Sequence, residues 1–319
     1  MNCLRGATAV LLALVVPAFV SSGSALAGAA TASPAAAAAC AAIDASNEAS
    51  GLPSTFPDSG CNWIGRVIRD NGIGVTVPGA GFTAGAEALY VSGSQTLNVT
   101  HGADGTITVR RAASTSGSPA IILAACSDTA DALLGFRVSG GYSYRYNSAA
   151  VPSNVSGTAV GAISAGFTNL AANFTDCSGI TKHPAPVPHY LGTTTTFANV
   201  FTNYTCAAAD GQNVVSWLGS PGPLALTCWV ASGGILVQSD LAINHGDSWF
   251  TGAVPAGCSN SFDLQGVVTH EAGHAYGLAH TPGDPVTHQN QTMNSALSGC
   301  TTKYQTLGTG DLNGMIALY

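Results

Sequence analysis

The sequence predicts an α+β protein, in which a small, mainly β N-terminal region precedes a mixed domain of roughly 180 residues, a usual domain size. Residues 96–100 and 106–110 alternate β-branched or apolar residues with polar ones, as strands do. Residues 155–174 place apolar residues at spacings of three and four, as an amphipathic helix does. Residues 264–277 predict a second helix, and this one carries a cluster of histidines.

The first 27 residues have the layout of a secretory signal peptide. Arg5 supplies a positive charge, an apolar run follows, and small residues end at Ala25-Leu26-Ala27, an A-x-A cleavage site. The run is shorter than the roughly 20 residues of a membrane-spanning helix, and no basic stop follows it. We therefore expect a removed signal rather than an anchor, and a secreted, extracellular protein.

Cysteine usage agrees with export. Loss of Cys3 with the signal leaves eight of the nine cysteines, an even number that predicts up to four disulfides in an oxidising compartment. These are Cys40, Cys61, Cys126, Cys177, Cys206, Cys228, Cys258 and Cys300. Eight cysteines allow 105 pairings, so the sequence leaves the connectivity open. No C-x-x-C spacing occurs, which argues against a cysteine zinc site.

Composition narrows the range of partners. Only 8% of residues are charged, the net charge is −7, and the two lysines are Lys182 and Lys303. There is no basic stripe and no polybasic segment, so neither nucleic acid nor a membrane surface is an expected partner. We expect a monomer.

Residues 28–138 form the predicted N-terminal region, and its role as a propeptide or an accessory β domain stays open. The two alternating segments named above should form a β-hairpin, because Ala103-Asp104-Gly105 supplies turn residues between them.

The second region, residues 139–319, should begin with a strand at GYSYRYN. The helix that follows has one apolar face, made by Val160, Ile163, Phe167, Leu170 and Phe174. A Pro/Thr-rich loop, KHPAPVPHYLGTTTT, comes next. NVVSWLG and ALTCWVASGGILVQSDLAIN then predict strands, with Gly233-Gly234 as a turn or bulge.

The segment HEAGHAYGLAH, residues 270–280, concentrates metal-binding chemistry. His270 and His274 are four residues apart, so on a helix their rings project from one side and could reach one Zn²⁺. Gly277 can adopt a left-handed conformation and end the helix, which returns His280 to a third metal position. Glu271 borders the same site without having to be a ligand.

Three neutral histidines with an open fourth position describe a catalytic rather than a structural zinc site. Zinc lowers the pKa of its water to about 7, and Glu271 could take the proton as general base. The remaining histidines are interpreted as surface or hydrogen-bonded residues: His101, His183, His189, His245 and His288.

H-E-x-x-H-x-x-G-x-x-H is the zinc signature of the metzincin metallopeptidases, and the sequence resembles that family. Met293, thirteen residues after His280 in QTMNSAL, suits the family's methionine turn beneath the metal. The resemblance is closest to the matrixin-like secreted proteases, through GQNVVSW, LVQSDLAIN, FDLQGVVTHE and the ending LGTGDLNGMIALY. In that ending the matching residues are Asp311, Gly314, Leu318 and Tyr319.

The resemblance covers about residues 140–319 and implies a metzincin-like catalytic domain: a twisted mixed sheet, an active-site helix, a methionine turn and a C-terminal helix. It implies a zinc metalloendopeptidase with one Zn²⁺ and with Met293 supporting the metal site from below. Its polypeptide substrate would lie antiparallel to a strand edge. By resemblance that edge is GGILVQSD, residues 233–240.

Some family features are missing. The propeptide motif P-R-C-G is absent, and Cys61 or Cys126 would be a poor substitute because its use leaves an odd number for disulfides. Bound Ca²⁺ would fit the family, but the pattern that holds structural zinc and calcium is lacking; His183 and His189 are the nearest candidates and are interpreted as loop residues. Ser295 stands where some metzincins have a tyrosine ligand.

Two alternatives stay open. One is a zinc hydrolase of a non-peptide amide or ester, which would use the same metal chemistry in a different cleft. The other is a non-catalytic secreted binding protein that retains the metal site. The intact Glu271 argues against the second, because packing does not need a carboxylate beside the metal.

Overall fold

The structure is a computed structural model that describes residues 49–58, 61–115, 121–219 and 221–319. The predicted signal peptide, with Cys3, lies outside the described residues, and so does Cys40. Within the described ranges, no helix has the length and apolar character that crossing a membrane requires.

A large mixed sheet dominates the fold. Over the described residues it has nine strands, in the order β1-β6-β5-β4-β12-β13-β11-β7-β8. Their bounds are β1 Thr55–Pro57, β4 Phe82–Tyr90, β5 Gly93–His101, β6 Thr106–Thr115, β7 Tyr142–Tyr146, β8 Pro188–Thr193, β11 Val214–Leu218, β12 Ala225–Ser232 and β13 Ile235–Asn244. Neighbours from β1 to β13 are antiparallel and those from β13 to β8 are parallel. The predicted α+β class, with a mixed sheet, is confirmed.

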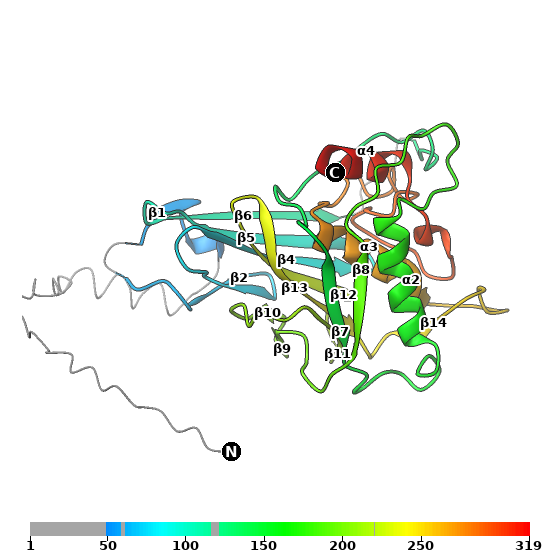
Figure 1. Cartoon of the computed structure of the whole chain (residues 1–319), viewed down its shortest axis with the longest axis horizontal. Coiled ribbons are helices and arrows are strands. Elements are labelled where there is room, and N and C mark those ends of the chain that lie inside the picture. The colour runs from blue at the N-terminus through cyan, green and yellow to red at the C-terminus, as the bar shows by residue number, and fades with distance from the viewer. Residues whose placement is uncertain (1–48, 59–60, 116–120, 220) are drawn as a thin grey trace, which may run out of the picture.

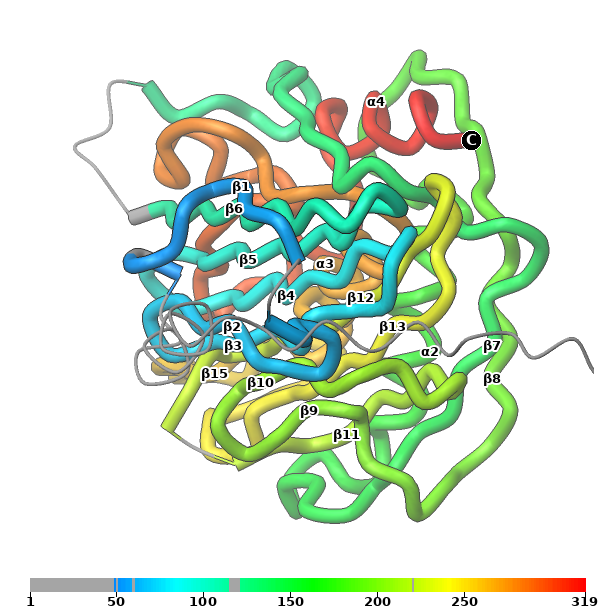
Figure 2. The backbone as a smooth tube through the Cα atoms, turned by 90° about the vertical axis from the view of Figure 1, so that its left-hand side faces the viewer, coloured from blue at the N-terminus to red at the C-terminus, as the bar shows by residue number. Residues whose placement is uncertain are grey.

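Two smaller sheets and a few helices complete the structure. The strands are β2 (Val67–Asp70), β3 (Ile73–Thr76), β9 (Val200–Phe201), β10 (Thr205–Cys206), β14 (Ser248–Phe250) and β15 (Ser261–Asp263). The helices are α2 (Ala159–Ala171), α3 (Leu264–Tyr276) and α4 (Thr309–Leu318), with 3₁₀ turns η1 (Ala49–Gly51) and η2 (Lys303–Gln305). Figure 1 shows α2 and α3 together beside the sheet, while β1, β4, β5 and β6 extend away from the helices. Figure 2 shows β1, β6, β5, β4 and β12 stacked in sheet order.

The large sheet separates two cores, and β4 contributes to both because its side chains alternate between faces. Ala84, Ala86 and Ala88 pack into the core shared with β2 and β3. Leu89 points the other way, into the core that includes residues of α2 and α3. Glu87 is on the face of Leu89, so the strand directs its one carboxylate toward α3 rather than toward the β-only core.

Several local predictions are confirmed. β5 and β6 form the expected antiparallel hairpin, with Gly105 at φ +79° in its turn. The strand at GYSYRYN is β7, and Gly233 and Gly234 both have positive φ between β12 and β13. α2 buries three of the five predicted apolar residues but ends at Ala171, so Phe174 lies beyond it and is 47% exposed.

The predicted Pro/Thr-rich loop is wrong in part, because Pro188–Thr193 forms strand β8, parallel to β7. β8 is an edge strand and Pro188 is its first residue, a position where a missing N–H removes no necessary hydrogen bond.

The predicted strand edge, residues 233–240, is occupied in part. β13 lies between β12 and β11, but β11 pairs only with Leu241–Asn244. Along residues 233–240, Arg137 exchanges main-chain hydrogen bonds with Gly234 and Leu236 on the side away from β12. β12 is interior to the sheet, because β4 pairs with it antiparallel, with Phe82 opposite Ser232 and Leu89 opposite Ala225. The N-terminal strands thus extend the sheet beyond β12, and they do not pair with residues 233–240.

Three disulfides join described residues: Cys126–Cys177, Cys206–Cys228 and Cys258–Cys300. The first crosses the predicted boundary at residue 138, and the second ties β10 to β12. Disulfides of this kind form in oxidising compartments, which agrees with export.

A buried carboxylate in β13 predicts a pH dependence of stability. Asp240 accepts hydrogen bonds from Gln238 Nε2 at 2.6 Å and from Val214 N at 3.2 Å, and burial raises its pKa from 3.8 to about 7. The pKa of Asp240 is higher in the folded than in the unfolded protein, so folding favours the protonated carboxyl group. The stability that this group contributes is fully present below pH 3.8 and is lost as the pH rises to about 7. We expect Asp240→Asn to remove this dependence.

Denaturant unfolding of chelator-treated wild type and Asp240→Asn across this pH window measures the effect. As the pH rises, the unfolding free energy of wild type should fall relative to that of Asp240→Asn by up to about 1.4 kcal/mol per pH unit. A difference that stays constant over the window would contradict the prediction.

Candidate metal centre

Helix α3 begins and ends where the sequence predicts. Asp263 is its N-cap, and its carboxylate accepts a hydrogen bond from Gly266 N at 2.9 Å. Gly277 ends the helix with φ +106°, and its N–H donates to His274 O at 3.0 Å. An added Cβ at Gly277 would lie 2.1 Å from Phe136 O, so both the backbone conformation and the close contact require glycine.

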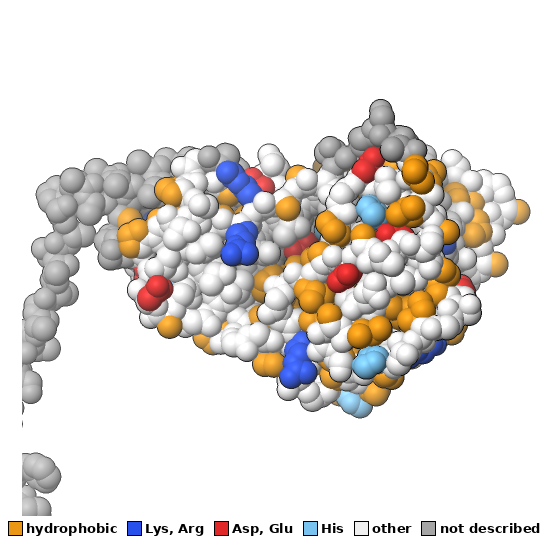
Figure 3. All heavy atoms as spheres, turned by 90° about the horizontal axis from the view of Figure 1, so that it is seen from above, with side chains coloured by type: hydrophobic (Ala, Val, Ile, Leu, Met, Phe, Trp, Pro, Cys, Tyr) orange, Lys and Arg blue, Asp and Glu red, His pale blue; other side chains and the backbone are white. Residues whose placement is uncertain are grey.

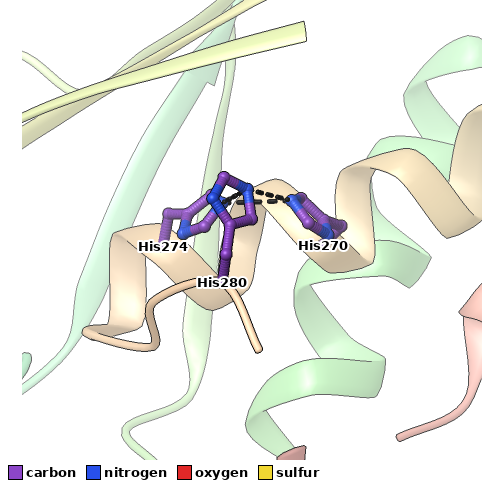
Figure 4. A group of neighbouring side chains, drawn as sticks. All are labelled: His270, His274 and His280. Carbon is purple, nitrogen blue, oxygen red and sulfur yellow. Dashed lines mark hydrogen bonds between the residues drawn. The ribbon is translucent and has the colours of Figure 1, made fainter. Parts of the chain in front are cut away.

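The chain reversal at Gly277 brings His280 to the two histidines of α3. The Nε2 atoms of His270 and His274 are 3.1 Å apart, and Nε2 of His280 is 3.2 Å from each of them. Figure 4 shows the rings of His270 and His274 projecting from α3, with the His280 ring meeting them from the following segment. This is the one group of three or more potential ligands close enough for a metal ion among the described residues, and it could hold one.

Hydrogen bonds fix the rings of both helical histidines. His270 Nδ1 lies 2.7 Å from Thr292 O, and His274 Nδ1 lies 2.9 Å from Leu278 O. A carbonyl oxygen only accepts, so Nδ1 carries the hydrogen in each ring, and Nε2 of the neutral ring is a lone pair.

All three histidines are held in the neutral form that binds metals. Burial lowers the pKa of His270 to about 4. Burial, together with the other rings, lowers the pKa values of His274 and His280 well below the usual value. Metal binding to imidazole requires this deprotonated state.

The segment beneath α3 is fixed by one carboxylate. Asp311, in the first turn of α4, accepts hydrogen bonds from Thr292 N at 2.8 Å, Met293 N at 3.0 Å and Gly308 N at 2.8 Å. Thr292 O in turn accepts from His270 Nδ1, so this turn links Asp311 to the histidine cluster.

Met293 packs directly against α3 at Gly273. Its side chain is 1% exposed, and a Cβ at Gly273 would meet Met293 Sδ at 2.2 Å. Met293 O also accepts a hydrogen bond from Thr281 N at 2.8 Å, which ties the segment after His280 to this turn. Met293 thus contacts α3 and Gly277 ends this helix, while their support of a metal stays a prediction.

Glu271 lies beside the histidine cluster but is not part of it. Its Oε2 accepts a hydrogen bond from Thr227 Oγ1 of β12 at 2.6 Å, and Oε1 has no partner among the described residues. Burial raises the pKa of Glu271 to about 8, the Thr227 bond opposes this rise, and the nearby Glu87 adds to it. A carboxylate with this pKa can take and return a proton near neutral pH.

A second carboxylate at the site was not predicted from the sequence. Glu87, on β4, places Oε2 at 3.4 Å from His280 Nδ1. Glu87 was missed because a lone glutamate in a strand matches no motif, although its position among alanines and glycine in FTAGAEALY was a usable signal.

A cleft of about 390 Å³ reaches His280, the third histidine of the cluster. One wall is formed by β4, β5 and β6, including Glu87 and Arg110, and the other is formed by residues 279–283, including His280. Its size is within the usual range for ligand sites. On the face shown in Figure 3, charged side chains are few and scattered, as the composition predicts.

The other described histidines have no role in this cluster. His101 Nδ1 contacts Pro78 O at 3.0 Å, and His288 Nδ1 contacts Asp128 Oδ2 at 2.8 Å. Both are accounted for by hydrogen bonding, as the sequence interpretation expected.

No protein-family model matches the sequence, and no curated protein matches it. The resemblance to the metzincins therefore stays a prediction based on the motif residues.

Proposed function

We propose that the chain is a secreted zinc-dependent endopeptidase resembling the metzincins. His270, His274 and His280 would hold the zinc, and Glu271 would act as general base. The observation that carries the proposal is the convergence of three Nε2 atoms at 3.1–3.2 Å. Lone pairs at this distance repel one another unless a cation lies between them.

The donor set fits zinc. Nitrogen ligands 2.0–2.1 Å from a tetrahedral zinc are about 3.3 Å from each other, close to the separations found here. Neutral imidazoles fixed through Nδ1 are typical zinc ligands. Neither Glu87 nor Glu271 belongs to the ligand cluster. The three histidines therefore leave the fourth position of a zinc ion open for water or substrate.

Residues around the metal would transfer a proton and orient the ligand rings. When bound, zinc polarises a carbonyl and acidifies water. Glu271 would take a proton from the attacking water at Oε1, while the hydrogen bond from Thr227 keeps Oε2 in place. Glu271 would then give this proton to the leaving amine. Thr292 and Leu278 hold two ligand rings in the orientation that presents Nε2.

The surroundings of the histidines support the resemblance. Met293 packs under α3, and the helix at the C-terminus fixes its turn through Asp311. The disulfides and the predicted signal peptide support secretion. The substrate would enter by the cleft between β4–β6 and the His280 segment.

A zinc hydrolase of a non-peptide amide or ester is the second candidate, and one observation favours it. β4 covers β12, so the strand beside the metal offers no free edge to an extended peptide. A small substrate in the cleft needs no such edge.

Mass spectrometry of products distinguishes the two candidates. The secreted chain is incubated with denatured casein and, separately, with small amide and ester substrates, each with and without a zinc chelator. Chelator-sensitive cleavage at internal peptide bonds is the expected result. Chelator-sensitive turnover of the small substrates alone would replace the endopeptidase proposal with the second candidate.

A further inference from the structure

The three histidines differ in what holds their second ring nitrogen. His270 and His274 donate from Nδ1 to main-chain carbonyls. His280 Nδ1 is buried and makes no hydrogen bond with any described residue. The acceptor that faces it is Glu87 Oε2, at 3.4 Å.

Glu87 is placed there by the sheet. It pairs directly with Thr227 across β4 and β12, so both side chains point to the α3 face. Thr96 Oγ1, on β5, donates to Glu87 Oε2 at 2.6 Å and fixes the carboxylate. Glu87 itself is completely buried, and its Oε1 has no partner among the described residues.

A carboxylate in this environment is costly without a cation close by. No lysine or arginine ion pair with Glu87 is present within the described ranges. A bound divalent cation, reached through the His280 ring, would offset this cost.

Glu87 is not arranged as a ligand itself. The Glu87 oxygen faces Nδ1 of the His280 ring, whereas His270 and His274 face Nε2 of the same ring. Its oxygens also do not lie within 4.8 Å of all the ligand atoms of the cluster.

We propose that Glu87 is a positioning residue of the metal centre, which accepts a hydrogen bond from His280 Nδ1 and so orients the third ligand. This proposal rests on metal binding by the histidines, as in the proposed function. Its consequence is that residues of the N-terminal region complete the centre. A chain without β4 would hold the metal more weakly.

The test is the zinc affinity of the whole secreted chain, measured by competition with a chromophoric chelator. Glu87→Leu removes the acceptor at similar volume and should weaken zinc binding by about 10–100-fold. Glu87→Gln keeps an oxygen that can accept from Nδ1, so its loss should be clearly smaller. Hydrolysis should fall in the same order.

Thermal unfolding of the metal-free proteins separates positioning from folding. Glu87→Leu should unfold at the temperature of metal-free wild type or above, because an apolar side chain replaces a buried carboxylate. Gln95→Leu is the matched control, because Gln95 is buried on β5 and its side-chain amide donates to Asp70, away from the histidines. It should lower the unfolding temperature and leave zinc affinity unchanged.

Unchanged zinc affinity in Glu87→Leu would overturn the proposal. Faster hydrolysis in this variant would overturn it too, and would mean that Glu87 blocks the centre. Wild type that binds no zinc would refute the proposed function as well, so the two failures are distinguishable.

Discussion

Replacing Glu271 with glutamine should abolish most hydrolysis while the protein keeps its zinc. General acid–base catalysis contributes about 10²–10⁴-fold, so kcat/KM should fall by at least about a hundredfold. The amide can still accept the hydrogen bond from Thr227 but cannot take a proton. Steady-state kinetics and metal analysis of the purified variant measure both quantities.

Asp240→Asn is the matched control, because it makes the same chemical change to another buried carboxylate outside the histidine cluster. It should retain wild-type kcat/KM at neutral pH. Hydrolysis that survives in Glu271→Gln would show that the base lies elsewhere. Loss of zinc from the variant would show a structural role for Glu271.

Gly277→Ala should damage both the fold and the metal centre. The left-handed backbone alone costs of order 1–3 kcal/mol for a residue with a side chain. The new Cβ would also lie 2.1 Å from Phe136 O, so the chain must move just before His280. We expect a loss of unfolding free energy above this range and a weaker zinc affinity.

Gly252→Ala separates the two causes. Gly252 has φ +76°, but a Cβ there meets nothing within 4 Å. Its variant should lose only the backbone contribution and bind zinc normally. Denaturant unfolding and zinc competition on both variants test this, and equal losses in the two would contradict the role given to the Phe136 contact.

The histidine centre was predictable because its signals are local. One helix and one turn place His270, His274 and His280, and the sequence carries a cap at each end of that helix, Asp263 and Gly277. The same holds for the β5–β6 hairpin, whose strands and turn are adjacent in sequence.

What could not be predicted depends on pairing between distant segments. No local pattern indicates that β4 pairs with β12, more than a hundred residues away, yet this pairing makes β12 an interior strand. It also delivers Glu87 to His280. β8 was missed because prolines and threonines dominate a segment whose edge position tolerates them.

A zinc titration tests the central claim most directly. The chelator-treated chain is titrated with zinc while bound metal and hydrolysis of denatured casein are followed together. We expect activity to rise with bound zinc and to reach its plateau at one zinc per chain, and we expect neither effect in His274→Ala. Saturation with one zinc and no hydrolysis of any substrate would contradict the enzymatic account, and failure to bind zinc would contradict the metal centre itself.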